Sequence, residues 1–192
     1  MAKQIGLGTI VGAVAIFLVT FVWHMVLPFA ETGFKNLPHD EALTTAMRLG
    51  ISEPAIYIFP TMDPSKRTDP AEMKSYADKF QRGPTGLLIY QPGGTEFSFP
   101  KLLANQFLFG AIAAFVISWL LAMSAGSLPG YGQRVLFVAL VALFGCLIID
   151  LPYWNWYGFP GNYTVAHLAG MVATWAITGL ALAAVVKPRA TA

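Results

Sequence analysis

The sequence has few charged residues and a single cysteine. Of its 192 residues, 11% are charged, against about 25% in ordinary soluble domains. Cys146 lies in an apolar run, so the chain has no intramolecular disulfide framework and no cysteine-based metal site. The same surroundings indicate that Cys146 is a small buried side chain. The net charge is +2 and no basic tract occurs, which argues against a nucleic-acid partner.

Catalytic motifs are also lacking. The sequence contains no Ser-His-Asp arrangement, no P-loop and no dinucleotide fingerprint. Several carboxylates in the polar segment 31–100 have the spacing of helix caps and of a solvated helix face, namely Asp63, Asp69, Glu72 and Asp78. The sequence therefore favours a non-catalytic protein, although it leaves enzymatic activity open.

Hydrophobic residues are abundant, at 56% of the chain, and they gather in four long blocks. Crossing a bilayer takes about 20 apolar residues. The first block is too long for the apolar part of a signal peptide, and residues 28–30 make a poor cleavage site. The sequence predicts an all-α integral membrane protein, a four-transmembrane-helix bundle with spans at residues 5–27, 102–124, 135–151 and 163–186.

The basic residues of the short loops predict the orientation. If the chain crosses four times, Lys3, Arg134, Lys187 and Arg189 all lie on one side. The positive-inside rule then places both termini in the cytoplasm and the long segment outside. The predicted domains are residues 1–30 (first helix), 31–100 (extracytoplasmic, or periplasmic, cap) and 101–192 (helices two to four).

The exported segment has the signals of a small α/β insert. Residues 38–50 predict a helix ending at Gly50, and residues 55–59 predict a strand. A second helix follows Asp69 as its N-cap and stops at Gly83, and residues 85–94 predict a second strand with a Gly-rich turn. Such a small unit needs to pack on the membrane helices or on a partner.

Four stretches carry a resemblance to known proteins. They are WHMVLP (23–28), AIYIFP (55–60), GPTGLLIYQP (83–92) and the run from Asp150 through aromatic residues to His167. In these stretches the chain resembles an uncharacterised group of small four-span bacterial inner-membrane proteins. The resemblance implies the four-span layout and a bacterial source, and it implies no activity.

Small residues at four-residue spacing favour close helix contact in lipid. The second span has such a stripe, and the first and fourth spans have shorter ones. These stripes predict either packing within the chain or contacts with other subunits. The residues are Gly110, Ala114, Ser118, Ala122 and Gly126 in the second span, Gly8 and Gly12 in the first, and Gly170 and Thr174 in the fourth.

Polar side chains recur near the outer end of every span. At 1.5 Å per residue, Asp150 lies about 24 Å from Arg134, and His167 about 30 Å from Lys187. His24 lies about 31 Å from Lys3 along the first helix. These depths allow one polar layer of His24, Gln106 (or Asn105), Asp150 and His167. They predict that Asp150 and His167 lie within hydrogen-bonding or water-bridged reach, with His24 or Gln106 close by.

Four interpretations of this layer stay open. It can be a structural clasp, a zinc or non-haem iron site, a pair of axial histidines for haem b, or an acid-base pair. The aromatic residues beside it predict an interfacial belt or a platform for a lipid or quinone headgroup. They are Tyr153, Trp154, Trp156, Tyr157 and Phe159 in the expected turn 152–162.

Three classes of function follow from these features. The first is an accessory or scaffolding subunit that engages other membrane subunits or a second copy of the chain. The second is a metal- or haem-binding redox or hydrolytic protein that uses His24, Asp150 and His167. The third is an oligomeric transporter or channel, which requires an oligomer because the middle of each span is apolar.

Overall fold

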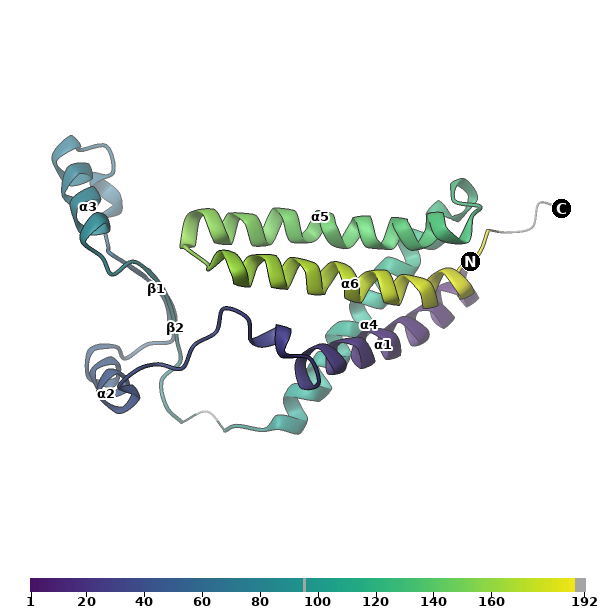
Figure 1. Ribbon diagram of the computed structural model, residues 1–192, viewed down its shortest axis with the longest axis horizontal. Coiled ribbons are helices and arrows are strands. Elements are labelled where there is room, and N and C mark those ends of the chain that lie inside the picture. Colours follow the sequence, from purple (N-terminus) through teal and green to yellow (C-terminus); the bar gives the residue numbers. More distant parts are fainter. Residues whose placement is uncertain (95, 189–192) are drawn as a thin grey trace. The chain divides into compact units, whose positions relative to one another are not determined.

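The structure is a computed structural model, and it describes residues 1–94 and 96–188 (Figure 1). The chain is mostly helical. Arg189, one of the basic residues used above to predict orientation, lies outside the described residues. The elements are α1 (Ala2–Met25), α2 (Asp40–Gly50), β1 (Ala55–Phe59), α3 (Pro70–Arg82), β2 (Gly86–Tyr90), α4 (Phe99–Ser124), α5 (Tyr131–Tyr157) and α6 (Gly161–Val185), with 3-10 turns at Pro28–Glu31, Pro64–Lys66 and Ala125–Ser127.

Helices α1, α4, α5 and α6 coincide with the four apolar blocks. They are 24 to 29 residues long when the 3-10 turn after α4 is included, and each is apolar enough to cross a membrane. A helix of 24 residues is about 36 Å long, which exceeds the roughly 30 Å hydrocarbon core of a bilayer. The chain therefore has the layout of a multi-pass membrane protein.

Helix α5 is longer than the sequence predicted. The prediction of a turn at residues 152–162 is wrong, because the turn is shorter and α5 continues through Pro152 to Tyr157. Only residues 158–160 connect α5 to α6, and Gly158 takes a positive φ of 72° there. Proline removes one backbone donor, but an apolar helix tolerates this loss when its neighbours compensate. Four of the five predicted belt residues, Tyr153, Trp154, Trp156 and Tyr157, thus lie on the last turns of α5.

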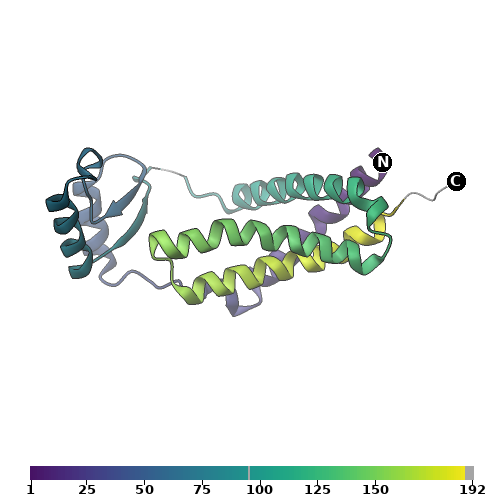
Figure 2. The same cartoon turned by 90° about the horizontal axis from the view of Figure 1, so that it is seen from above.

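The chain divides into two compact units. The helical unit comprises Met1–Phe34, Ser98–Trp154 and the chain from Phe159 onward. The strand unit comprises Lys35–Phe97 and Asn155–Gly158. In the helical unit, the start of α1 and the end of α6 lie at the same end, as both views show (Figures 1 and 2).

Two apolar clusters form the core of the helical unit. One joins α4, α5 and α6, and the other joins α1 and α4. Trp175 of α6 packs against both clusters. The buried members are Ile117, Leu121, Val138, Leu182 and Val186 in the first cluster, and Ala13, Ile16 and Ala114 in the second.

Helices α1 and α4 approach each other through small residues. A Cβ atom on Gly8 would lie 2.6 Å from Ser118 Oγ, and one on Gly12 would lie 3.0 Å from Ala114 Cβ. Gly110, Ala114 and Ser118 of the predicted stripe are buried, and Ala122 is half-buried. Gly126 is exposed, because it lies in the 3-10 turn after α4. The stripe thus ends one helical turn earlier than its spacing suggested.

Helix α6 makes close contacts with two neighbours. A Cβ atom on Gly170 would lie 2.5 Å from the ring of Trp23 in α1, so the indole covers this glycine. On another side, a Cβ atom on Gly179 would lie 3.2 Å from Val138 Cβ in α5. Thr174 is buried with them. The small residues of α6 therefore pack within the chain.

Arg134 joins α5 to the end of α6. Its side chain is 5% exposed. Nε and Nη2 donate to the Ala183 carbonyl at 3.3 and 3.2 Å, and Nη1 donates to the carbonyls of Leu128 and Pro129 at 3.1 and 2.8 Å. From the sequence, Arg134 was considered only as a loop charge that predicts orientation. In the structure, its planar guanidinium group donates hydrogen bonds to three backbone carbonyls.

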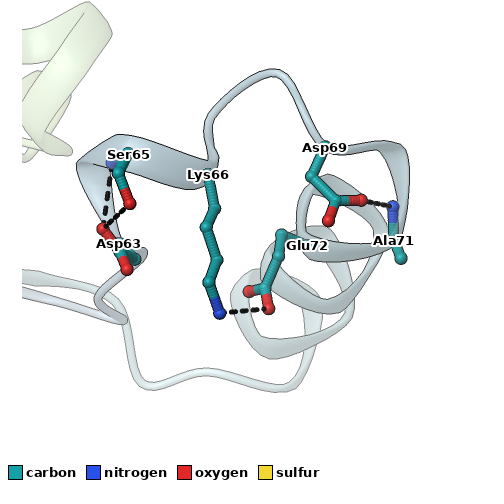
Figure 3. Close-up of polar contacts among 6 residues, drawn as sticks. All are labelled: Asp63, Ser65, Lys66, Asp69, Ala71 and Glu72. Carbon is teal, nitrogen blue, oxygen red and sulfur yellow. Dashed lines mark hydrogen bonds and ion pairs between the residues drawn. The ribbon is translucent and has the colours of Figure 1, made fainter.

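The strand unit contains the helices and strands that were predicted. β1 and β2 form an antiparallel pair in which Ile56 lies opposite Ile89. Asp69 caps α3 by accepting a hydrogen bond from the Ala71 N–H at 2.8 Å, and Gly83 follows its last residue (Figure 3). Strong local signals such as this cap and the proline after it thus identified the elements correctly.

Asp63 caps the short turn that precedes α3. Its Oδ1 accepts from the Ser65 hydroxyl at 2.7 Å and from the Ser65 N–H at 2.9 Å (Figure 3). The hydroxyl first, and then the backbone N–H, lower the pKa of the Asp63 carboxyl. Nearby, Lys66 Nζ lies 3.3 Å from Glu72 Oε1 in an exposed ion pair. The predicted role of these carboxylates as caps and surface charges is therefore confirmed for Asp63, Asp69 and Glu72.

One face of the two-stranded sheet is apolar and exposed. Ile56, Ile58 and Ile89 are 65%, 50% and 71% exposed. They share a face because cross-strand partners and alternate residues of a strand point to the same side. On the other face, the rings of Tyr57 and Tyr90 meet edge to face, with centroids 6.5 Å apart.

Candidate polar site in the helical unit

Asp150 and His167 form a hydrogen-bonded pair between α5 and α6. His167 Nδ1 lies 3.0 Å from Asp150 Oδ2, as the depths along the two helices predicted. The Asp150 side chain is 7% exposed and that of His167 is 41% exposed. Helices α5 and α6 lie antiparallel and side by side after a three-residue connection (Figures 1 and 2). This arrangement lets the two side chains meet.

This pairing explains how an acid is accommodated in an apolar helix. A charged side chain facing lipid at the bilayer centre costs about 2.5–3.5 kcal/mol, and a partner lowers that cost. When Asp150 is ionised and His167 is neutral, Nδ1–H donates to the carboxylate and Nε2 is left as an acceptor. When His167 is protonated, both ring nitrogens donate. The pair can therefore offer a donor or an acceptor to a third group.

Aromatic rings extend from the end of α5 to His167. Tyr153 stacks on Phe159 with centroids 5.2 Å apart, and Phe159 contacts Tyr163 at 5.5 Å. Tyr163 in turn stacks on the His167 imidazole at 5.7 Å and 12°. Phe159 is half-buried and Tyr153 is 45% exposed. These rings hold the imidazole in place on the side facing the helix ends.

Two cavities adjoin His167. The larger, about 410 Å³, lies between α4, α5 and α6, and Asp150 and His167 line it together with Cys146. We call it the α4–α6 groove. The smaller, about 240 Å³, lies between α1, the Pro28–Glu31 turn and α6, and both His24 and His167 line it. His167 is thus the residue shared by the two cavities.

The predicted polar layer is only partly assembled. Asp150 and His167 meet, and His24 lines a cavity that His167 also lines. Asn105 and Gln106 are exposed on α4 and line neither cavity. The stripe of small residues indicated the contact face in the middle of α4, but it carries no signal for what surrounds the amides at the start of the helix, so their depth was predictable and their surroundings were not.

The residues present do not fit a zinc or iron site. Across residues 1–94 and 96–188, no three His, Cys, Asp or Glu side chains converge in a way that could hold a metal ion. A haem between His24 and His167 is also a poor fit, because the 240 Å³ cavity is smaller than the 300–1,000 Å³ typical of sites for drug-sized ligands. Within the described residues, the pair links α5 to α6 and places two polar side chains in the lining of the α4–α6 groove.

Sequence reasoning missed the groove and two buried hydroxyls. The groove is lined on α5 by Ala142, which has only a methyl group, and by Gly145, which has no side chain, and these positions leave space beside α4 and α6. Ser118 Oγ and Thr178 Oγ1 are buried and find no hydrogen-bond partner within the described part of the chain.

Comparison with known proteins adds no relative. No protein family, no curated protein and no solved structure matches the chain. Its function is therefore inferred from its own residues.

Proposed function

We propose that the protein is a non-catalytic accessory or scaffolding subunit of a membrane complex in the bacterial inner membrane. In this proposal the four long helices form a four-helix bundle, and the insert of residues 31–100 is exported as a small α/β cap. The observation that carries the proposal is the apolar sheet face of Ile56, Ile58 and Ile89, which is at least half exposed at each position.

The sheet is a suitable surface for a protein partner. It has two strands, and a hairpin-sized sheet is marginally stable alone in water. Each strand also has one edge whose backbone groups pair with no other strand of the described chain. A partner that covers the isoleucines or adds a strand would stabilise both features. Other membrane subunits and a second copy of this chain are the candidate partners.

The small-residue stripes support placing the partner surface on the insert. Gly8 and Gly12 of α1 already face Ser118 and Ala114 of α4, and Gly179 of α6 already faces Val138 of α5. Those faces are used within the chain. The isoleucines of the sheet stay at least half exposed in the described part of the chain, and this difference favours the insert as the contact region.

The orientation is part of the proposal. Exposed Lys3 and Lys187 at the start of α1 and after α6 favour cytoplasmic termini under the positive-inside rule. In a Cys146→Ala background, single cysteines at Lys66 and Lys187 should react with a membrane-impermeant maleimide from opposite sides of spheroplasts. Labelling of both positions from outside would contradict this orientation.

The partner surface is tested by isolating the full-length protein from native membranes in polymer nanodiscs. Ile56→Asp with Ile89→Asp should release a co-purifying subunit or shift the complex to a smaller mass. Leu49→Asp is the matched control, because Leu49 is 85% exposed on α2 and does not belong to the sheet. A wild-type protein that is monomeric and free of other membrane proteins would contradict the proposal.

A further inference from the structure

We infer that the α4–α6 groove binds one uncharged, single-chain lipid whose head carries a carbonyl or hydroxyl oxygen. Isoprenoid quinones and long-chain alcohols share this chemistry. The apolar chain would occupy the length of the groove, and the head would hydrogen-bond to the Asp150–His167 pair at its end.

The groove has the size and lining of a lipid-chain site. Its volume of about 410 Å³ falls in the 300–1,000 Å³ range of small-molecule sites. Along α5 its lining runs from Val138 to Asp150, a distance of about 18 Å along the helix axis. Trp175 and Met171 of α6 line the opposite wall. The long dimension therefore follows the helices, the direction in which a lipid chain lies in a bilayer.

The ionisable groups of the lining gather at one end. Asp150 and His167 are one hydrogen-bonded unit, and the rest of the described lining is apolar or carries the weakly polar Cys146 thiol. The buried carboxylate fixes the imidazole through Nδ1, so Nε2 can accept from a hydroxyl or, when protonated, donate to a carbonyl. One pair can thus bind both the alcohol and the carbonyl form of a head.

The depth of the pair selects an uncharged head. Asp150 lies seven residues before the end of α5, about 10 Å along the axis, and His167 lies about 9 Å from the start of α6. Helix α5 has 27 residues and is about 40 Å long, against a hydrocarbon core of about 30 Å. With α5 centred in the bilayer, the pair lies about 5 Å inside the hydrocarbon. There, loss of hydration costs a charged phospholipid headgroup far more than it costs the hydroxyl of an alcohol or the carbonyls of a quinone, which the pair can hydrogen-bond.

A single hydrocarbon chain fits the groove better than a helix of a second subunit does. A helix with side chains is about 10–12 Å wide, so only part of one face of it could enter a groove of about 410 Å³. An unbranched hydrocarbon chain can lie along the whole length of the groove.

Gly145 provides a variant that fills the groove without disturbing the helices. It lines the groove, and a Cβ atom there would meet nothing within 4 Å. Gly145→Leu should therefore place its side chain in the space that the lipid would occupy. Gly132→Leu is the matched control, because Gly132 is on the same helix, has the same open surroundings and lies outside the groove. Equal thermal stability of the two variants shows that both are folded.

The test measures binding of labelled probes to full-length protein in phospholipid nanodiscs. Decylubiquinone and 1-hexadecanol are the two headed probes, and hexadecane is the probe without a head. We expect saturable binding of a headed probe at one per chain, weakened at least tenfold in Gly145→Leu and unchanged in Gly132→Leu. Asp150→Asn should weaken the binding of the headed probe several-fold. Whichever headed probe binds more tightly shows whether the natural ligand is a quinone or a long-chain alcohol.

Three results would overturn the inference. They are an absence of saturable binding by either headed probe, equal binding by Gly145→Leu and the wild type, and hexadecane binding as tightly as the headed probes. The last result would leave the groove without a role for Asp150 and His167. Because none of these measurements involves a partner subunit, failure here is distinguishable from failure of the proposed function.

Discussion

The helical unit and the strand unit differ in what they bury. In the helical unit, most of the buried residues are glycine, alanine, serine and threonine at helix contacts, although Leu121 and Leu182 are buried among them, and most of the large apolar side chains are exposed. In the strand unit, neither α2 nor α3 has a buried residue, and of its described residues only Tyr90 is buried. The first pattern is that of helices in lipid, where close approach of helices through small residues adds to a small apolar core.

The comparison shows where each unit obtains its stability. The helical unit depends on close contacts that leave no room for larger side chains, such as Gly12 against Ala114. The strand unit depends on local signals, such as the Asp69 cap and the antiparallel register of β1 and β2. Local signals hold elements together but bury little area, which is why the exposed isoleucines of its sheet are the surface that we assign to a partner.

The largest expected effect comes from enlarging Gly12. A Cβ atom there would lie 3.0 Å from both Ala114 Cβ and Leu182 Cδ2, so Gly12→Leu should force α1 away from α4 and α6. Overpacking of this kind costs about 1–3 kcal/mol, and more where backbones must separate. The free energy of unfolding in mixed micelles measures the loss.

Gly6→Leu is the control for this substitution. Gly6 is on the same helix, and a Cβ atom there would meet nothing within 4 Å. It should leave the unfolding free energy nearly unchanged. Equal destabilisation by both variants would contradict the small-residue contact between α1 and α4.

The next effect concerns Arg134. Replacing it by alanine leaves carbonyls of Ala183, Leu128 and Pro129 without their donor, and an unsatisfied buried group costs about 1–3 kcal/mol. Arg134→Lys keeps the positive charge but lacks the planar guanidinium group. The lysine variant should therefore be less stable than the wild type while the orientation of the chain in the membrane is unchanged. Unfolding free energy and maleimide labelling of the termini measure the two properties separately. Full stability of the lysine variant would show that charge alone is needed.

A smaller effect is expected from the Asp150–His167 pair. A double-mutant cycle with Asp150→Ala and His167→Ala should give a coupling of about 1 kcal/mol, within the range for residues in contact. Removal of His167 alone should cost more than removal of both, because it leaves a buried carboxylate without its partner. Additive single effects in the cycle would mean that the hydrogen bond contributes nothing to stability.

What could be predicted from the sequence differs between the two units for a physical reason. Helices α2 and α3 are amphipathic, and α3 is capped by Asp69, so their bounds and their strand neighbours could be predicted from local residue types. The long helices are apolar on all sides, so their existence and the depth of Asp150 and His167 were predictable. The direction of Asn105 and Gln106, the continuation of α5 past Pro152 and the exposure of Gly126 were not, because they depend on helix rotation and on contacts between helices.

The smallest expected effect belongs to the strand unit and concerns Asp63. The Ser65 hydroxyl and N–H hydrogen-bond to its carboxylate and lower its pKa below the ordinary value of 3.8. A lowered folded-state pKa stabilises the fold above the unfolded pKa, and this contribution is lost as the pH falls through the folded value. Ser65→Ala removes the larger of the two causes, so the pKa of Asp63 should rise, as a carboxyl-detected NMR titration of the full-length protein would measure. The exposed Ser52→Ala serves as the control and should leave that titration unchanged. An Asp63 titration that is identical in all three proteins would mean that the hydroxyl does not hold the carboxylate in solution, and that the local signals of this unit are weaker than the capped helix α3 suggests.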